Sequence, residues 1–367
     1  LFTLLFVNLL QAQLMNSNSY RNSNNPLYWQ NRKPHAAYWQ QDVHYNIAAR
    51  IDEEAKKIDA IEDLEYFNNS PDTLQFVYFH LYQNAFINKS YLRALEKANY
   101  AQPPLGPNER VGKGIVINAI TVDGTNVNLE LDNTILKVYL PKPLLPNDKV
   151  NLSLMFTTYY DRTATRRRMQ MYNAWGFTHF NGVQWYPKIS VYDAKFGWDT
   201  YQHLNKEFYG DFGSFDVQLD FPSNYIVEAT GVLQNKNEVL PDSLLQKIDV
   251  KNFAKAKPND TPSIIIPYEK GKRKIWKFHA DNVHDFAFTA DPSYRMSIVD
   301  WEGIKCVGLV QEPHAATWQN SASFVAKIIQ TFSRDFGRYQ YPKMVAADAN
   351  DGMEYPMLTL DGGGDPD

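Results

Sequence analysis

Alternation of apolar and polar residues dominates the chain from about residue 38 to residue 294 and predicts β-strands. An apolar residue at every second position is typical of a strand with one face in a core and the other in solvent. Residues 45–51, 150–156 and 215–221 all show this period. Residues 74–81 are densely apolar instead, which favours a strand buried on both faces.

Turn residues separate these segments. Asn68-Asn69-Ser70-Pro71, Val122-Asp123-Gly124 and Thr230-Gly231 have the composition of turns, and residues 251–262 are polar and predict an exposed loop. We find no internal repeat of fixed period. Regularly spaced strands with such breaks predict a mainly β domain of antiparallel sheets, arranged as a sandwich or a saddle.

The period changes after about residue 297, where apolar residues recur at steps of four and three. This spacing places them on one face of a helix, which we expect to be buried in the core. Gly337 and then Pro342 predict the end of the helix. An extended segment, residues 343–347, precedes an acidic turn. The residues of the predicted apolar face are Trp318, Ala322, Val325, Ile329, Phe332 and Phe336.

These patterns divide the chain into four parts. Residues 1–13 are apolar and then polar, as in the h-region and cleavage site of a signal peptide, although a buried helix or strand fits them too. They predict export to the periplasm or beyond. Residues 14–37 are rich in Asn, Ser and Gln and predict a flexible terminus. Residues 38–296 form the β-rich domain, and 297–367 begin an α/β or α+β domain. No other stretch is apolar enough to span a bilayer.

Composition narrows the classes of function. The 367 residues are 44% hydrophobic and 14% aromatic, which is the composition of a globular protein. The net charge of −4 gives no bulk attraction to nucleic acid or anionic membranes. Arg166-Arg167-Arg168 is expected to be a solvated loop. Cys306 is the only cysteine, so an intramolecular disulfide framework and a thiolate zinc site are excluded. We expect it to be a small buried residue rather than a catalytic thiol.

The most informative short segment is Asp351-Gly352-Met353-Glu354. It offers a carboxylate on a predicted turn beside glycine, where a ligand can approach the backbone closely. Such a carboxylate could hold an ammonium group by a charge-assisted hydrogen bond. Two alternatives stay open at this point. The acid could simply be exposed on a loop, or it could bind calcium with Asp348 and its neighbours, although the spacing differs from that of a calcium loop.

No other catalytic signature occurs in the sequence. Its histidines lack metal-ligand spacing, and H-E-x-x-H, a G-x-S-x-G elbow, a phosphate loop and a dinucleotide fingerprint are absent. His284 is followed by an acid and an aromatic residue, and we interpret it as a structural histidine on a strand.

Taken in chain order, several segments resemble the aminopeptidase N family of zinc metallopeptidases, the gluzincin exopeptidases. Gln184-Trp185-Tyr186-Pro187-Lys188 resembles an aromatic segment of a bacterial branch, and Gly352-Met353-Glu354 matches part of the family's Gly-x-Met-Glu-Asn motif. The other segments are residues 42–47, 66–72, 80–84, 192–193, 197–198, 211–217, 229–231 and 283–287.

The resemblance implies a saddle-like amino-terminal domain followed by the start of a thermolysin-like catalytic domain. It also implies that Glu354, with Gly352 and Met353, binds the free amino terminus of a peptide substrate. The family's zinc ligands and its catalytic residues would follow Asp367, so we expect the full-length protein to use zinc and this chain alone to be inactive. The chain departs from the motif at Tyr355, where the family has Asn, and at Asp351.

Two rival hypotheses remain. The first is a non-catalytic β-rich module that binds peptides or glycans through aromatic residues such as Trp175, Trp185 and Trp198. The second is a structural scaffold. The preferred substrate residue is not predicted. We expect a pocket of the β domain to help select it, but the sequence does not place the selecting residue, near Thr178 or elsewhere.

Overall fold

The computed structural model describes Asn24 and residues 37–362, except residues 102, 162–168 and 205–207. By internal contacts the chain divides into two compact units, Leu1–Trp39 and Gln40–Asp367. The described residues of the first unit form no helix or strand. The predicted signal peptide, most of the predicted flexible terminus and the run Arg166-Arg167-Arg168 lie outside the described residues, and they stay predictions.

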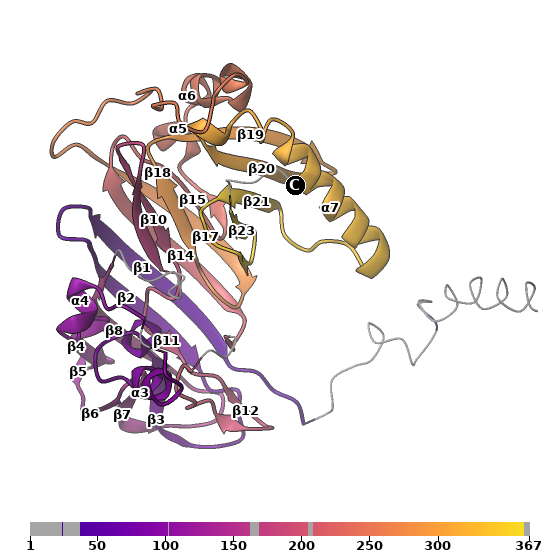
Figure 1. Ribbon diagram of the computed structural model, residues 1–367. Helices are drawn as coiled ribbons and strands as arrows, with labels where there is room; N and C mark the ends of the chain where they lie inside the picture. Colours follow the sequence, from indigo (N-terminus) through magenta and orange to yellow (C-terminus); the bar gives the residue numbers. More distant parts are fainter. Residues whose placement is uncertain (1–23, 25–36, 102, 162–168, 205–207, 363–367) are drawn as a thin grey trace, which may run out of the picture. The chain divides into compact units, whose positions relative to one another are not determined.

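In the described part of the second unit the strands form five sheets (Figure 1). The largest has eight strands in the order β16-β17-β14-β1-β2-β8-β4-β5. In that order their bounds are Val232–Leu233, Arg273–Val283, Gly213–Pro222, Asp42–Asp52, Lys57–Phe67, Lys149–Tyr159, Ile115–Val122 and Thr125–Asn126.

Three smaller sheets complete the β-rich part. One contains β15 (Ile226–Ala229), β18 (Phe288–Asp291), β10 (Phe177–Gly182) and β9 (Gln170–Ala174). The second contains β11 (Lys188–Ile189), β3 (Leu74–His80), β7 (Ile135–Leu144) and β6 (Leu129–Asp132). The third pairs β12 (Tyr192–Asp193) with β13 (Gly197–Trp198). Short helices in the connections are η2 (Tyr82–Ala85), α3 (Tyr91–Ala98), α4 (Pro107–Arg110), α5 (Lys236–Val239), α6 (Asp242–Ile248) and η3 (Val250–Phe253).

The mainly β class is confirmed, and the alternating segments form β1, β8 and β14 with their apolar residues buried. In the eight-stranded sheet one pairing is not antiparallel: β1 and β14 run parallel, with Tyr45 beside Phe215. Their rings stack at 4.5 Å. The two strands are far apart in sequence, so no tight hairpin forces them to be antiparallel.

The prediction for residues 74–81 was wrong on one face. Val77 and Phe79 of β3 are buried, but Phe76 and Tyr78 on the other face are only half-buried. The Lys137 ammonium covers these two rings, 4.2 Å and 5.9 Å from their centres. Aromatic faces can be shielded in this way by a cation instead of by an apolar layer.

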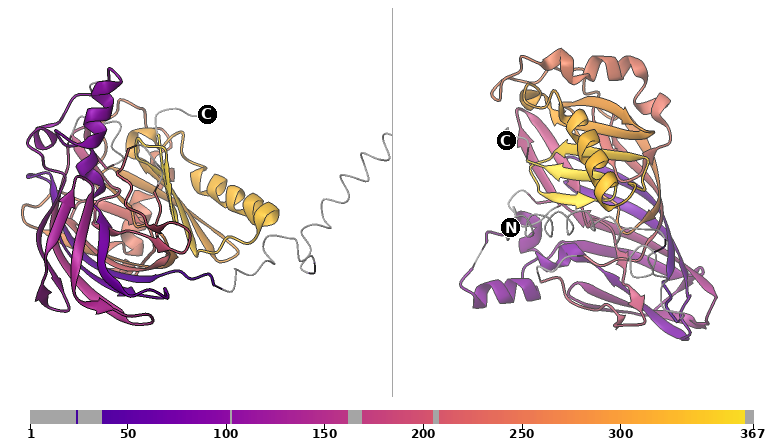
Figure 2. Two further views of the ribbon diagram at one scale, coloured as in Figure 1. Left: turned by 90° about the horizontal axis from the view of Figure 1, so that it is seen from below. Right: turned by 90° about the vertical axis from the view of Figure 1, so that its right-hand side faces the viewer.

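The fifth sheet has the strand order β19-β20-β21-β23-β22. Its strands all lie in the last quarter of the chain: β19 (Tyr294–Trp301), β20 (Ile304–Gln311), β21 (Lys343–Asp348), β22 (Met353–Tyr355) and β23 (Leu358–Asp361). The connection from β20 to β21 contains η4 (Glu312–His314) and α7 (Ser321–Phe336). Helix α7 packs across β19, β20 and β21 (Figure 2). It ends at Gly337, whose φ of 121° suits glycine, as the sequence predicted.

The apolar face predicted for α7 is only partly buried. Val325 and Ile329 pack on Cys306, which is fully buried as expected. Trp318 precedes the helix, and Phe332 and Phe336 are more than half exposed. The period locates an apolar stripe, but Ile329 is the last buried residue of the helix. Phe324 and Ile328 are more than half exposed as well.

This difference along α7 gives a stability prediction. We expect Ile329→Ala to lower the free energy of unfolding by about 2–5 kcal/mol, because it leaves a cavity against Cys306. Phe332→Ala should change it by less than about 1 kcal/mol, because that ring is exposed. Urea unfolding of both variants measures the difference. Equal losses would show that Phe332 is part of the core after all.

An acid lies inside the eight-stranded sheet. Glu62 on β2 is 0% exposed, and in the described structure neither of its carboxylate oxygens has a hydrogen-bond partner. It faces the core because the alternation of β2 points every second residue inward. Burial raises the pKa of Glu62 well above its usual value, with a smaller contribution from Asp63. The folded chain therefore favours the neutral acid.

We expect Glu62→Met to raise the free energy of unfolding at pH 8 by about 1–3 kcal/mol, because a buried polar group without a partner is removed. The gain should shrink towards pH 5. Above the ordinary pKa of 4.5 the unfolded chain loses its proton while the folded chain keeps it, so the natural protein loses stability as pH rises. Denaturation of both proteins at the two pH values tests this. Glu62→Gln is the control, since it abolishes the pH dependence but keeps a polar group. A gain that is the same at both pH values would contradict the expectation.

Candidate functional site

Glu354 lies on β22, the edge strand of the five-stranded sheet. β22 is antiparallel to β23, with Glu354 opposite Thr359. Successive side chains of a strand point to opposite faces, so Met353 and Tyr355 share one face and Glu354 lies on the other. Glu354 is exposed, whereas Tyr355 is buried. The sequence predicted this carboxylate on a turn, which was wrong: the turn follows it, at Met357, where φ is 64°.

A cavity of about 400 Å³ adjoins this strand. Its size lies within the range of roughly 300–1,000 Å³ that is common for ligand sites. It is lined by Gly352, Met353, Glu354 and Tyr355 together with Phe208, His284 and Asp285. The structure thus brings the predicted site residues into one cavity with three residues that sequence reasoning did not assign to a site. Thr178 is not among the lining residues.

His284 is not on a strand, which corrects the prediction. It lies in the turn that leads from β17 to β18, half-buried, with its ring 5.3 Å from that of Phe212. Burial, and then the positive charge of Lys188, lower the pKa of His284 from its ordinary value of 6.5. The ring is therefore neutral at pH 7.

Asp285 is part of the cavity wall, and its charge is paired with that of Lys188. Its Oδ1 accepts hydrogen bonds from the Tyr186 hydroxyl and the Phe286 amide, each at 2.8 Å. Its Oδ2 lies 3.3 Å from the ammonium of Lys188, and both side chains are nearly fully buried. Since Asp285 is paired and His284 is neutral, the exposed carboxylate of Glu354 sets the charge of the cavity.

A second acid reinforces that charge. Asp361 ends β23, and its Oδ1 accepts a hydrogen bond of 3.4 Å from Thr359. Burial raises the pKa of Asp361, and the nearby charges of Glu354 and Asp348 raise it further. Asp361 is therefore close enough to two other carboxyl groups to interact with both. Such a group of acids attracts a cation more strongly than one exposed acid does.

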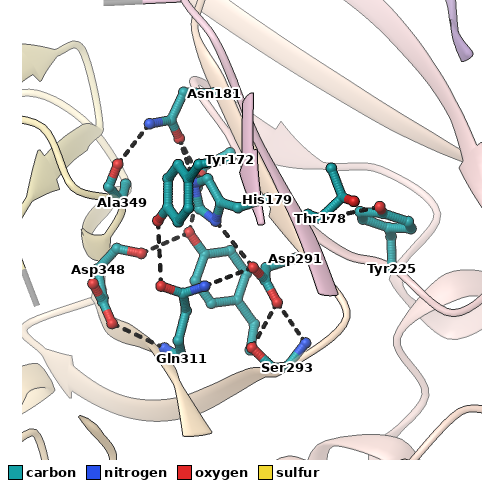
Figure 3. Close-up of polar contacts among 12 residues, drawn as sticks. Tyr172, Thr178, His179, Asn181, Tyr225, Asp291, Ser293, Gln311, Asp348 and Ala349 are labelled. Atoms are coloured by element: carbon teal, nitrogen blue, oxygen red, sulfur yellow. Dashed lines mark hydrogen bonds and ion pairs between the residues drawn. The ribbon is translucent and has the colours of Figure 1, made fainter. Parts of the chain in front are cut away.

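Polar contacts hold the segment that leads to Glu354 (Figure 3). Asp348 ends β21, and its Oδ2 accepts hydrogen bonds from the backbone N–H of Gln311 at 3.2 Å and from His314 Nδ1 at 2.7 Å. The backbone oxygen of Asp348 accepts one from the Tyr294 hydroxyl at 2.9 Å. Asn181 of β10 donates to the backbone oxygen of Ala349 at 2.7 Å. These contacts tie the five-stranded sheet to the sheet that contains β10.

The β10 side of this network is fully buried. The two ring nitrogens of His179 lie 3.1 Å from Asp291 Oδ2 and 2.9 Å from Asn181 Oδ1. Asp291 also accepts a hydrogen bond from Gln311 at 2.7 Å and two from Ser293 at 2.6 Å. Buried polar groups that are satisfied in this way make a rigid support. His179 is therefore structural, and it is not among the residues that line the cavity.

Tyr355 has a structural role. It is 6% exposed, and its hydroxyl accepts a hydrogen bond of 3.0 Å from the side chain of Gln184. Gln184 itself has a φ of 47°, an uncommon conformation for a residue with a side chain. The tyrosine in place of the family's asparagine thus joins the edge strand to the aromatic segment at residues 184–188.

Two further observations concern the described residues only. They contain no group of three or more His, Cys, Asp or Glu that could hold a metal ion. None of the helices in the described ranges is long and apolar enough to cross a membrane.

Comparison with known proteins extends this picture at the level of fold. No protein-family model matches the chain. No curated protein matches its sequence either.

Solved structures do match. An M1 zinc metallopeptidase from Deinococcus radiodurans superposes with a TM-score of 0.54 at 12% identity, over 88% of this chain and 60% of that chain. A variant of it bound to a Tyr-Ser-Ala substrate superposes with a TM-score of 0.54 at 12% identity, over 88% of this chain and 61% of that chain. A two-domain M1 zinc metallopeptidase variant bound to L-tryptophan superposes with a TM-score of 0.54 at 13% identity, over 90% of this chain and 63% of that chain.

At this identity the likeness shows the fold alone. The chain has the fold of the corresponding part of M1 zinc metallopeptidases, and it spans less than two thirds of their length.

Proposed function

We propose that this chain is the amino-terminal, substrate-binding part of a zinc-dependent aminopeptidase, and that Glu354 binds the free α-ammonium group of a peptide. The observation that carries the proposal is the exposed Glu354 carboxylate on edge strand β22, at a cavity of about 400 Å³. The M1 metallopeptidase fold supports it, and one structure of that fold is bound to a peptide substrate.

The geometry suits an extended peptide that enters with its amino end first. In the described structure β22 pairs on one side only, with β23, so its other edge can accept main-chain hydrogen bonds from a peptide. Gly352 faces open space, since a Cβ atom there would meet nothing within 4 Å. An ammonium group at Glu354 would then form a charge-assisted hydrogen bond. A blocked amino terminus would lose that bond, which is how an exopeptidase recognises chain ends.

The described residues do not fit a zinc site, and we assign no catalytic step to them. When bound, zinc would polarise the scissile carbonyl and activate water. We propose that its ligands belong to the full-length protein outside the described residues, in an H-E-x-x-H motif with a more distant Glu. On this proposal the chain alone binds peptide ends without cleaving them.

The complete protein tests the proposal. We expect it to contain zinc, to release single residues from a peptide with a free amino terminus, and to spare the same peptide after acetylation. Metal analysis and chromatography of the products measure both properties. A complete protein without bound zinc, or one that cleaves the acetylated peptide equally fast, would overturn the proposal.

The rival binding module loses its proposed surface. Trp185 is fully buried in the core. Trp175 is half-buried, and its indole nitrogen donates to the Pro258 carbonyl at 2.8 Å. Trp198 packs on Tyr192 with ring centres 4.9 Å apart. These three residues therefore do not form one exposed aromatic platform for a glycan.

A further inference from the structure

A second pocket lies where helices α5 and α6 and strand β16 meet strands β19, β20 and β21 (Figure 1). Its volume is about 260 Å³, and it shares no lining residue with the Glu354 cavity. Ordinary ligand sites have volumes of roughly 300–1,000 Å³. The pocket is slightly smaller than that range, so it suits a small molecule of amino-acid size.

A buried ion pair forms part of the pocket wall. Glu228 on β15 and Lys343 on β21 both line the pocket, and they are 6% and 5% exposed. The Lys343 ammonium donates to Glu228 Oε2 and to the backbone oxygen of Ala229, each at 2.8 Å. These two bonds hold both charged groups in fixed positions, as buried charges require.

The pair has hydrogen-bonding capacity that the described part of the chain does not use. Both hydrogen bonds to the Glu228 carboxylate go to Oε2, the second from the Ala229 backbone N–H at 3.4 Å. Oε1 accepts none from the described residues and is not closed off from solvent. An ammonium has three N–H donors, and the two bonds of Lys343 leave one. The pair thus offers one acceptor and one donor to a ligand.

The inner wall beside this pair is apolar. Leu240, Met296 and Val307 are nearly fully buried, and Leu233 and Leu245 are half-buried against the same core. An apolar group placed on these side chains would leave water, which favours binding. The other charged residues of the lining are more exposed and include both signs: Lys236, Asp300 and Lys305.

We propose that this pocket binds a free α-amino acid with an apolar side chain, such as leucine. The α-ammonium donates to Glu228 Oε1, the α-carboxylate accepts from the Lys343 ammonium, and the side chain lies on the apolar wall. An acid without the amine would meet the negative charge of Glu228, and an amine without the acid would meet the positive charge of Lys343, so the zwitterion fits best. The pocket is separate from Glu354, and the proposal does not rest on the proposed function.

Calorimetry with L-leucine tests the proposal. It is done on the natural chain and on Glu354→Gln, which removes the separate carboxylate that could bind the same amine, and leucine binding should persist in that variant. There we expect an affinity at least about tenfold higher than for 4-methylpentanoate, which lacks the amine, or for 3-methylbutylamine, which lacks the carboxylate. L-serine should also bind at least about tenfold more weakly, because it leaves the apolar wall uncovered.

Two variants locate the site. Leu245→Trp enlarges a half-buried side chain of α6 and fills the pocket, and Leu95→Trp, at an exposed leucine of α3, is its control. The double variant Glu228→Leu/Lys343→Met removes both charges together, which a folded protein tolerates better than the loss of one. Leu245→Trp and the double variant should each weaken leucine binding at least about tenfold, and Leu95→Trp should leave it unchanged.

Three outcomes would overturn the proposal. The first is no binding of L-leucine at millimolar concentration by the folded chain. The second is equal binding of the acid or the amine alone. The third is an unchanged affinity in Leu245→Trp. If circular dichroism shows that either pocket variant is unfolded, the comparison of the four compounds on Glu354→Gln decides.

Discussion

Glu354→Gln is expected to lower the affinity of this chain for a peptide with a free amino terminus by roughly 10- to 150-fold. A hydrogen bond to a charged group contributes about 1.5–3 kcal/mol, and each 1.4 kcal/mol is a factor of ten. Glutamine keeps the size and one acceptor oxygen but loses the charge that pairs with ammonium. The affinity for the same peptide with an acetylated amino terminus should not change. Calorimetry with the two peptides measures the difference.

Glu54→Gln is the control for this experiment. Glu54 is an exposed acid in the turn between β1 and β2, and it does not line the cavity. If Glu354→Gln behaves like Glu54→Gln towards both peptides, Glu354 is only an exposed acid, which is the plainer alternative that the sequence allowed. If both peptides bind equally well to the natural chain, the amine is not recognised at all.

The strands were predictable because a period of two can be read directly from residues such as Tyr45, Ile47 and Ala49. The parallel pairing of β1 with β14 was not, since nothing in either segment names a partner that distant in sequence. The helical period gave α7 but not the exposure of Phe332, because a period marks a stripe and not the surface that covers it. Which residues of the α7 stripe are buried depends on how far the helix packs along the sheet.

The site was predictable only in part, and for a related reason. Glu354 came from a resemblance, because an acid beside glycine is common on its own. His284, Asp285 and Phe208 lie in a turn after β17 and in a connection before β14, and they meet β22 only through the tertiary fold. The departure at Tyr355 looked like a defect in the motif. Its hydrogen bond to Gln184 shows that the change at this position supports the strand.

Arg295 and Glu312 form a buried ion pair that joins β19 to η4. Arg295 Nε donates to Glu312 Oε2 at 2.8 Å, and a second guanidinium nitrogen contacts the same oxygen. The other Glu312 oxygen accepts hydrogen bonds from the amide and hydroxyl of Ser263, at 2.9 Å and 3.0 Å. η4 also carries His314, which bonds to Asp348. The pair thus supports the segment that leads to Glu354.

Arg295→Met is expected to lower the free energy of unfolding by about 3–5 kcal/mol, because the Glu312 carboxylate is left buried without its partner. The double variant Arg295→Met/Glu312→Leu should cost about 1–3 kcal/mol less than the sum of the single variants, since both charges leave together. Arg334→Met is the control, because its ion pair with Asp335 on α7 is exposed and should matter little. Chemical denaturation of the four variants, Glu312→Leu included, completes the cycle. If Arg295→Met costs no more than Arg334→Met, the buried pair does not hold η4 in place, and the support of Asp348 must come from the His179 network alone.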